Sequence, residues 1–239
     1  MRFCRPAATK RKRRLIMEEA HKALARTIEH TQLSPTATRA DILRACAEAI
    51  TIGCAGVCVN PCWIHLVAEQ LMGTALVPIC VVGFPLGATM PVVKADETRM
   101  VVEAGAKEID MVMNLGWLKS GSNRAVQSDI AGVVVAAQGR PVKVIIETSL
   151  LTHQEKLVAC HLAREAGAVY VKTSTGFVTG GATVEDVLLL RQTVGNAMRI
   201  KASGGIRDLA QAQALLAAGA DRLGCSRSVA ILEEAGWRP

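Results

Sequence analysis

The sequence predicts an α/β fold in which parallel strands and helices alternate along one domain. Half of the 239 residues are hydrophobic although aromatic residues make up only 3%. Apolar runs rich in Val and Ile recur, and a helix followed by a strand repeats along the chain. Because strands of a parallel sheet are covered on both faces, they read as aliphatic runs of this kind.

The repeat is clearest in three segments that share one layout. In "VVEAGAKEIDMVMN" (101–114), "LAREAGAVYVKTS" (162–174) and "ALLAAGADRLGCS" (214–226), a helical pattern ends at Ala-Gly-Ala and an apolar strand follows. Gly105, Gly167 and Gly219 fit the position after a helix that needs a left-handed conformation. Repetition of helix, glycine and strand is typical of parallel βα units.

Eight apolar runs are candidate strands, and helical patterns fill the gaps between them. The runs span 27–31, 56–60, 78–83, 108–114, 142–147, 169–174, 199–203 and 221–226. Eight βα units in roughly 250 residues match a single-domain TIM (β/α)8 barrel. The alternative is a doubly wound open sheet, which would normally carry G-x-G-x-x-G after its first strand. No such motif stands there.

A basic arm precedes the predicted barrel. Residues 1–16 contain seven basic side chains and no acidic one, whereas the rest of the chain carries 21 of each sign. The net charge of +7 therefore belongs to this arm. We expect residues 1–16 to be a disordered arm and 17–239 to be the barrel domain, with Met17 as an alternative start. The other interpretation is a tail for nucleic acid or an anionic surface, but we expect no nucleic-acid partner.

Composition also argues against membrane and metal functions. No apolar run approaches the ~18 residues of a membrane span, and no signal-peptide h-region of ~7–15 residues follows the arm. Several of the eight cysteines lie in apolar segments, which favours a reducing, cytoplasmic location over a disulfide scaffold. Cys54, Cys58 and Cys62 recur every four residues. Asn60 and Pro61 would interrupt the helix that a metal site needs, so we expect no metal and no cofactor.

Alternation along the strands indicates which side chains face the barrel axis. With the aliphatic positions packed against the helices, the inward set includes Asp110, Lys172 and Lys201 near strand ends, where TIM barrels have their active sites. The same rule places a further set inside: Cys58, Asn60, Glu108, Val112, Asn114, Lys143, Ile145, Glu147, Tyr170, Ser174 and Ser203. The interior is therefore expected to hold two lysines on adjacent strands with an aspartate two strands away.

Two lysines close together predict amine chemistry. Each ammonium group disfavours the charge of the other, and burial adds to this effect. One amine can then be neutral and nucleophilic near pH 7, as a Schiff base with a carbonyl requires, whereas an ordinary lysine with a pKa of ~10.4 stays protonated. The alternative is a structural ion pair of Lys172 with Asp110 or Glu147.

Two loops predict a phosphate site. "ASGGIRD" (202–208) follows the seventh strand, and "GCSRS" (224–228) follows the eighth. TIM barrels commonly bind phosphate at these two loops. Gly204 and Gly205 would let backbone N–H groups approach the ligand, and Gly224 and Ser226 would complete the site.

The chain resembles deoxyribose-phosphate aldolase, a family of class I aldolases, in eight motifs that run in order from about residue 26 to 232. They are "IEHTQL" (28–33), "VCVNP" (57–61), "VVGFPLG" (81–87), "EIDMVMNLG" (108–116), "VIIET" (144–148), "VKTSTGF" (171–177), "KASGGIR" (201–207) and "RLGCSRSVAI" (222–231). The resemblance implies reversible cleavage of 2-deoxy-D-ribose 5-phosphate to acetaldehyde and D-glyceraldehyde 3-phosphate, without a metal. It also implies a homodimer or larger homo-oligomer.

The resemblance further implies residue roles. Lys172 is the Schiff-base nucleophile, Lys201 lowers its pKa, and Asp110 takes part in proton transfer through a bound water. Residues implied to contact the substrate are Cys58 in the sugar site, Thr175 at the donor, and Gly176, Gly204, Gly205, Gly224 and Ser226 at the phosphate.

The chain departs from the family pattern at two places. Glu29 stands where the first motif often has Asp, so we expect contacts near the substrate hydroxyls to shift. The C-terminal "EEAGWRP" lacks the mobile tyrosine of some relatives, and the only tyrosine is Tyr170. Two other functions fit parts of the pattern: another phosphate-binding barrel enzyme such as an isomerase, which needs no lysine pair, and a non-catalytic phosphosugar sensor or nucleic-acid binder.

Overall fold

Eight parallel strands form a closed barrel in the computed structural model, which describes residues 18–238. Each strand pairs with the next, and the eighth returns to the first. The strands are β1 (Ile28–Gln32), β2 (Gly56–Val59), β3 (Val77–Val82), β4 (Glu108–Val112), β5 (Val142–Ile145), β6 (Tyr170–Lys172), β7 (Arg199–Ser203) and β8 (Arg222–Cys225). The predicted TIM barrel is confirmed. The basic arm predicted for residues 1–16 lies outside the described residues.

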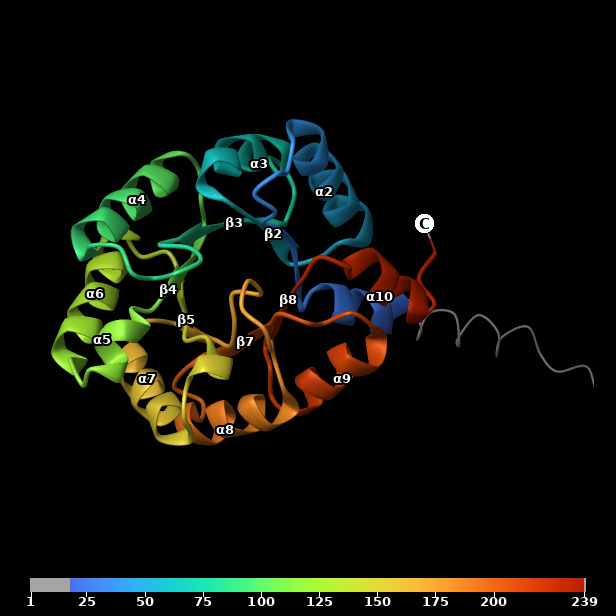
Figure 1. The fold of residues 1–239 in the computed structure, drawn as a ribbon. Coiled ribbons are helices and arrows are strands. Elements are labelled where there is room, and N and C mark those ends of the chain that lie inside the picture. The colour runs from blue at the N-terminus through green and yellow to red at the C-terminus, as the bar shows by residue number, and fades with distance from the viewer. Residues whose placement is uncertain (1–17, 239) are drawn as a thin grey trace, which may run out of the picture.

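Helices form a ring around the barrel in the view along its axis (Figure 1). They are α2 (Arg39–Ile52), α3 (Ile64–Gln70), α4 (Pro91–Glu103), α5 (Leu115–Lys119), α6 (Asn123–Ala136), α7 (His153–Glu165), α8 (Val184–Val194), α9 (Leu209–Ala217) and α10 (Ser228–Glu234). Two short 3-10 helices, η1 (Pro61–Trp63) and η2 (Thr148–Leu150), follow β2 and β5. Among the described residues, no helix is both long and apolar enough to cross a membrane.

Glycines end the helices where the repeat predicts. Gly105, Gly167 and Gly219 have φ values of 109°, 87° and 110° and follow α4, α7 and α9. An L side chain rarely adopts this conformation, whereas glycine does so freely. The chain can therefore turn directly from helix to strand at these three places, which fixes where the next strand enters the barrel.

Asparagine side chains shorten two strands relative to the prediction. β4 ends at Val112, and Asn114 caps α5 by accepting a hydrogen bond from the Trp117 N–H at 3.1 Å. At the end of β2, Asn60 precedes η1 and donates from Nδ2 to the Leu33 carbonyl at 3.2 Å. The Asn114 side chain therefore begins α5 instead of extending the strand, because it satisfies a backbone N–H of the following turn. The Asn60 side chain instead bonds the loop after β1.

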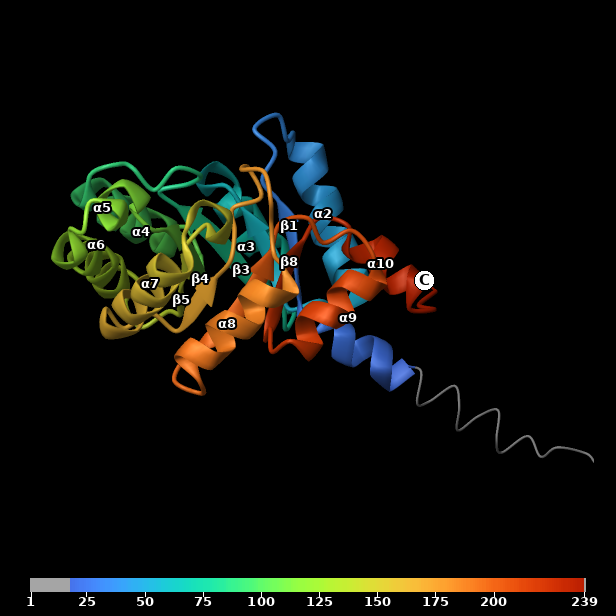
Figure 2. The same ribbon diagram turned by 60° about the horizontal axis from the view of Figure 1, so that its bottom comes forward.

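The two ends of the described chain lie together. Residues 18–25 are helical, and His21 Nε2 bonds the Ala235 carbonyl just after α10 at 2.5 Å. Figure 1 shows this first helix beside α10, and in Figure 2 it lies below α9 and α10. The outer layer of helices thus continues from the last βα unit to the first, across the place where β8 pairs with β1.

A buried ion pair joins two of the outer helices. Lys94 of α4 and Asp129 of α6 are both at most 1% exposed, and Lys94 Nζ donates to Asp129 Oδ2 at 2.6 Å. The same ammonium donates to the Val112 carbonyl at the end of β4 at 3.0 Å. Lys94 therefore ties both helices to the strand that carries Asp110.

Candidate active site

Three charged side chains predicted to face inward meet at the centre of the barrel. Asp110 is in β4, Lys172 is the last residue of β6, and Lys201 is in β7 directly opposite Lys172 in the strand register. Asp110 and Lys201 are fully buried, and Lys172 is 2% exposed. Alternation along each strand turns these side chains inward, and the closed sheet directs them to one point.

Asp110 connects the lysines through its two carboxylate oxygens. Oδ2 accepts from Lys172 Nζ at 2.8 Å and from Lys201 Nζ at 2.6 Å. Oδ1 accepts from the ammonium of Lys143 at 2.9 Å. The two lysines predicted to form a pair therefore share a single oxygen atom, so their nitrogens are close neighbours.

The surroundings make these two lysines unequal. Burial lowers the pKa of Lys172, the Asp110 carboxylate opposes this, and the nearby Lys201 charge lowers it further. Burial also disfavours the charged form of Lys201, but the Asp110 and Glu29 carboxylates raise its pKa above the ordinary value. Lys201 consequently stays protonated while Lys172 is the amine that loses its proton more readily.

Asp110 stays ionised in this cluster. Burial favours the neutral acid, but Lys143, Lys172 and Lys201 together hold the pKa of Asp110 well below its ordinary value. A carboxylate with three ammonium neighbours is ionised in the resting state, so it has no proton to donate and is a weak base. It is well suited to hold cationic groups in place and to accept a proton once a neighbouring charge is lost.

A cavity of about 330 Å³ opens above Lys172. Its wall combines the loops after β6, β7 and β8 with the end of β1. The residues predicted for substrate contact that line it are Thr175, Gly176, Gly204, Gly205, Gly224 and Ser226. A lysine with a lowered pKa at the floor and glycine-rich loops at the rim suit a ligand with a carbonyl at one end and an anion at the other.

Gly204 shows why this rim is built of glycine. Its φ is 83°, and an added Cβ would lie 3.1 Å from Gly181 Cα, 3.3 Å from Ser174 Cβ and 3.5 Å from Gly176 Cα. The loop after β6 and the loop after β7 therefore come together at this point. A side chain there would separate them and close the rim.

Comparison with known proteins identifies the family. The model of the DeoC/LacD family aldolases matches residues 20–232. The chain belongs to the DeoC/LacD aldolase family. A deoxyribose-phosphate aldolase of Geobacillus sp. (strain WCH70) is 54% identical over 211 residues, which cover 88% of this chain and 95% of the relative. That of Streptococcus gordonii is 55% identical over 210 residues, covering 88% and 96%.

A solved structure supports the same assignment for this DeoC/LacD aldolase. The tetrameric deoxyribose phosphate aldolase from Aeropyrum pernix superposes with a TM-score of 0.84 at 34% identity, covering 96% of this chain and 97% of the other. Membership of an aldolase family excludes the isomerase and the non-catalytic sensor as alternatives. The resemblance read from the eight sequence motifs is confirmed.

Lys143 is a buried member of the DeoC/LacD aldolase site to which the sequence analysis assigned no role. It is fully buried, and its ammonium lies 2.9 Å from Asp110 Oδ1, 2.6 Å from Glu108 Oε2 and 3.4 Å from Glu29 Oε1. Alternation had placed Lys143 inside the barrel. The register, which sets Lys143 opposite Asp110, is what reveals the contact.

Glu29 and Cys58 lie deeper than expected. Glu29 is fully buried, binds the ammonium of Lys201, and is not among the residues lining the cavity. The structure therefore places Glu29 in the buried charge cluster around Lys201, and not beside the cavity where contacts with the substrate hydroxyls were expected. Cys58 is also fully buried, packs with Leu33, Ile79 and Val81, and does not line the cavity.

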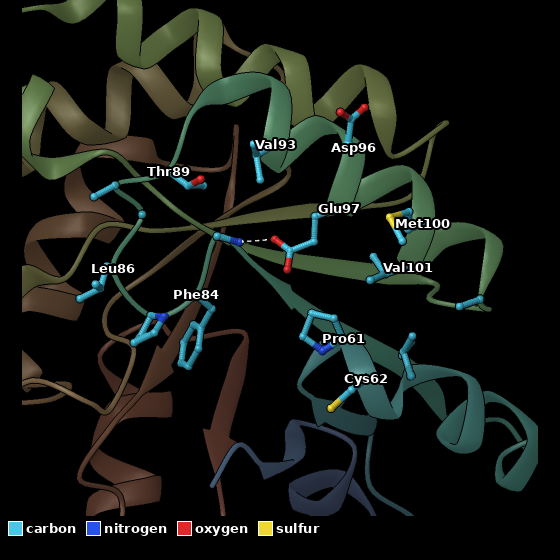
Figure 3. A pocket seen from close by; sticks show the side chains of 16 residues that line it. Pro61, Cys62, Phe84, Leu86, Thr89, Val93, Asp96, Glu97, Met100 and Val101 are labelled. Carbon is cyan, nitrogen blue, oxygen red and sulfur yellow. Dashed lines mark hydrogen bonds between the residues drawn. The ribbon is translucent and has the colours of Figure 1, made fainter. Parts of the chain in front are cut away.

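A second, larger cavity of about 950 Å³ lies elsewhere in the molecule (Figure 3). It lies between Pro61–Cys62, the loop after β3 and α4. Its wall is mainly apolar, and its charged side chains are Asp96 and Glu97, of which Glu97 Oε2 accepts from the Gly83 N–H at 2.7 Å. No lysine among residues 18–238 lines this cavity, so its size does not make it the site of imine formation.

Proposed function

We propose that this aldolase reversibly cleaves 2-deoxy-D-ribose 5-phosphate into acetaldehyde and D-glyceraldehyde 3-phosphate through a Schiff base on Lys172. One observation carries the proposal: the ammonium groups of Lys172 and Lys201 bind the same oxygen of Asp110, and only the pKa of Lys172 is lowered. The identity of the substrate is inferred from the deoxyribose-phosphate aldolase relatives, which are more than 50% identical to this chain.

In the proposed cycle the neutral Lys172 amine attacks C1 of the open-chain sugar. The resulting carbinolamine loses water to form an iminium. A base, Asp110 through a bound water, removes the proton of the C3 hydroxyl. The C2–C3 bond breaks, its electrons neutralise the iminium to give an enamine, and D-glyceraldehyde 3-phosphate leaves. A proton delivered to C2 and a water molecule added to C1 then release acetaldehyde and restore the amine. No metal ion takes part in these steps.

Lys201 has two proposed tasks in this cycle. Its positive charge disfavours protonation of Lys172, and its ammonium returns protons through Asp110. At the other end of the substrate, backbone N–H groups around Gly176, Gly204 and Gly205 bind the phosphate, with Gly224 and Ser226 opposite. Positive φ values of 76–84° at these first three glycines support this use, because they allow the backbone to approach the ligand.

The test is trapping with borohydride. Sodium borohydride added with acetaldehyde should reduce the imine and leave a stable ethyl group on Lys172, which peptide mass mapping locates. Lys172→Ala should lose essentially all turnover and all labelling. Lys119→Ala is a matched control, because Lys119 is an exposed lysine that pairs with Glu155. An adduct confined to Lys201, or no adduct in the native enzyme, contradicts the assignment.

We also propose that the chain works as a homodimer or larger homo-oligomer in the cytoplasm. The Aeropyrum pernix relative is tetrameric. In this chain Leu86, Met90, Val92 and Met100, in and just before α4, are 74%, 66%, 58% and 68% exposed. Monomeric proteins rarely leave large apolar patches bare, so a second copy is the proposed cover. Seven free cysteines among the described residues suit a reducing compartment.

A further inference from the structure

Glu147 is a buried acid that the proposed cycle does not use. It follows β5 in the "VIIET" motif, is 2% exposed, and has a backbone φ of 49°, a left-handed conformation that side chains other than glycine rarely adopt. Such conformations persist where the surrounding structure requires them, and they cluster at functional sites.

The carboxyl group of Glu147 lacks the partners that its depth would require. Its Oε1 is buried without a hydrogen-bond partner. Asp110, Glu29 and Asp129, which are equally buried, each contact a lysine, whereas no ion pair within residues 18–238 includes Glu147. Because an unpaired buried carboxyl group is costly, its contacts through Oε2 must account for its presence.

Those contacts all go to Thr175 at the rim of the cavity. Glu147 Oε2 accepts from the Thr175 N–H at 3.1 Å and from the Thr175 hydroxyl. The same hydroxyl oxygen accepts from the Phe177 N–H at 3.1 Å. A threonine hydroxyl has one hydrogen to donate. That hydrogen is committed to Glu147, so it is not available to a substrate.

The turn held in this way presents Gly176 to the ligand. Gly176, between the two anchored residues, has a φ of 84° and lines the cavity with Thr175 and Phe177. It packs against the Gly204 loop on its other side. The position of this glycine therefore depends on an acceptor in the neighbouring strand end.

We propose that Glu147 is a positioning residue that sets the phosphate affinity of the site by fixing the Thr175–Phe177 turn through Thr175. This rests on the proposed function, since the phosphate is the group that the turn would bind. Lys172 lies outside these contacts, so imine formation with a small aldehyde does not depend on them.

The experiment compares 2-deoxy-D-ribose 5-phosphate with unphosphorylated 2-deoxy-D-ribose. Glu147→Ala removes the acceptor and should raise KM for the phosphorylated sugar about tenfold, the usual effect of losing hydrogen bonds to a charged group. The kcat/KM for the unphosphorylated sugar and the borohydride labelling by acetaldehyde should change little. Glu147→Gln keeps an acceptor oxygen and should recover most of the phosphate preference.

Thr175 variants keep the proposal testable where Glu147→Ala does not fold. Thr175→Val removes the hydroxyl and should reproduce the loss of phosphate preference, whereas Thr175→Ser should not. In the double variant Glu147→Ala with Thr175→Val, the loss should be no larger than the greater single loss, because both changes break one chain of contacts.

Glu155→Ala is the matched control. Glu155 Oε2 likewise accepts from a threonine N–H, that of Thr152 at 2.7 Å, but at the start of α7 and away from the cavity. It should leave the ratio of the two kcat/KM values unchanged. Equal losses on both sugars in Glu147→Ala, or additive losses in the double variant, overturn the inference. Absence of imine labelling in the native enzyme instead overturns the proposed function.

Discussion

Lys172 and Lys201 are the same residue type in matching strand positions, yet their neighbours give them opposite behaviour. Lys201 contacts two carboxylates, Glu29 and Asp110, which outweigh the effect of burial on its pKa. Within the described part of the chain, the Lys172 amine has Asp110 as its one hydrogen-bond partner and lies beside a second cation. The additional carboxylate of Glu29 thus keeps Lys201 charged, whereas Lys172, which lacks it, can act as the nucleophile.

This difference predicts the pH dependence of Lys201→Leu. Only the deprotonated Lys172 amine attacks, so activity rises as the pH rises through the pKa of Lys172. Removing Lys201 removes a positive charge that lowers this pKa and leaves Asp110 free to stabilise the Lys172 ammonium. The acid limb of kcat/KM should therefore move to higher pH, and neutral-pH turnover should fall about 10²–10⁴-fold because a proton donor is lost.

The measurement is kcat/KM against pH for the native enzyme, Lys201→Leu and Lys119→Leu. The last variant removes an exposed lysine and should reproduce the native profile. An acid limb that does not move in Lys201→Leu would show that Lys201 does not control the protonation of Lys172.

Individual site residues differ in how far the sequence could reveal them. Lys172, Lys201 and Asp110 interrupt aliphatic strands with charge, so alternation alone places them inside. Lys143 follows the same rule, but its contact with Asp110 depends on the register between β4 and β5. The contact from Glu147 to Thr175 joins residues 28 positions apart across a turn with positive φ, and no local pattern encodes that geometry.

At the scale of elements, a buried ion pair between Lys94 and Asp129 joins α4 to α6. For this pair, the cost of burying both charges is larger than their attraction. Burial lowers the pKa of Lys94 and raises that of Asp129, each despite the attraction of the other. Removal from water therefore outweighs the mutual attraction for both partners. We therefore expect the pair to add little net stability to the packing of α4 against α6.

Asp129→Ala should consequently destabilise the fold by about 3–5 kcal/mol, because Lys94 remains buried without its partner. Replacing both residues, by Lys94→Met with Asp129→Leu, should recover most of this loss. Urea unfolding measures each change. Arg99→Ala, which breaks an exposed pair with Asp96, should cost less than about 1 kcal/mol. A double variant as unstable as Asp129→Ala would contradict this account of the pair.

Elements with periodic signals were predictable, whereas short ones were not. The Ala-Gly-Ala repeats located the ends of α4, α7 and α9 and the strands after them. The five-residue helix α5 was missed because Asn114, which caps it, reads as the inward end of a strand. Helices of this length carry less than two turns of hydrophobic periodicity.

For the whole molecule, counting βα units was enough to predict a closed barrel, because each unit adds one parallel strand and eight of them close. The same count does not reveal surfaces between copies. Val92 and Met100 of α4 are apolar, and their exposure becomes visible only in three dimensions.

The proposed assembly predicts that charge on α4 separates the copies. Val92→Glu with Met100→Glu should shift the mass measured by light scattering to that of a single chain, because acidic groups would be desolvated at a contact. Leu188→Glu is the matched control on α8, where Leu188 is 44% exposed, and should leave the mass unchanged. A native chain that is monomeric at micromolar concentration would contradict the assembly.

The charges at the barrel centre also bear on the order of events in the proposed cycle. Five ionisable groups are buried there: Glu29, Asp110, Lys143, Lys172 and Lys201. Two partly exposed groups, the acid Glu108 and the base Arg222, lie next to them. When Lys172 is neutral this set is electroneutral, and an iminium adds one unbalanced positive charge. Since such a charge is unfavourable in a low-dielectric interior, the barrel favours collapse to the neutral enamine, which is the step that breaks the carbon–carbon bond.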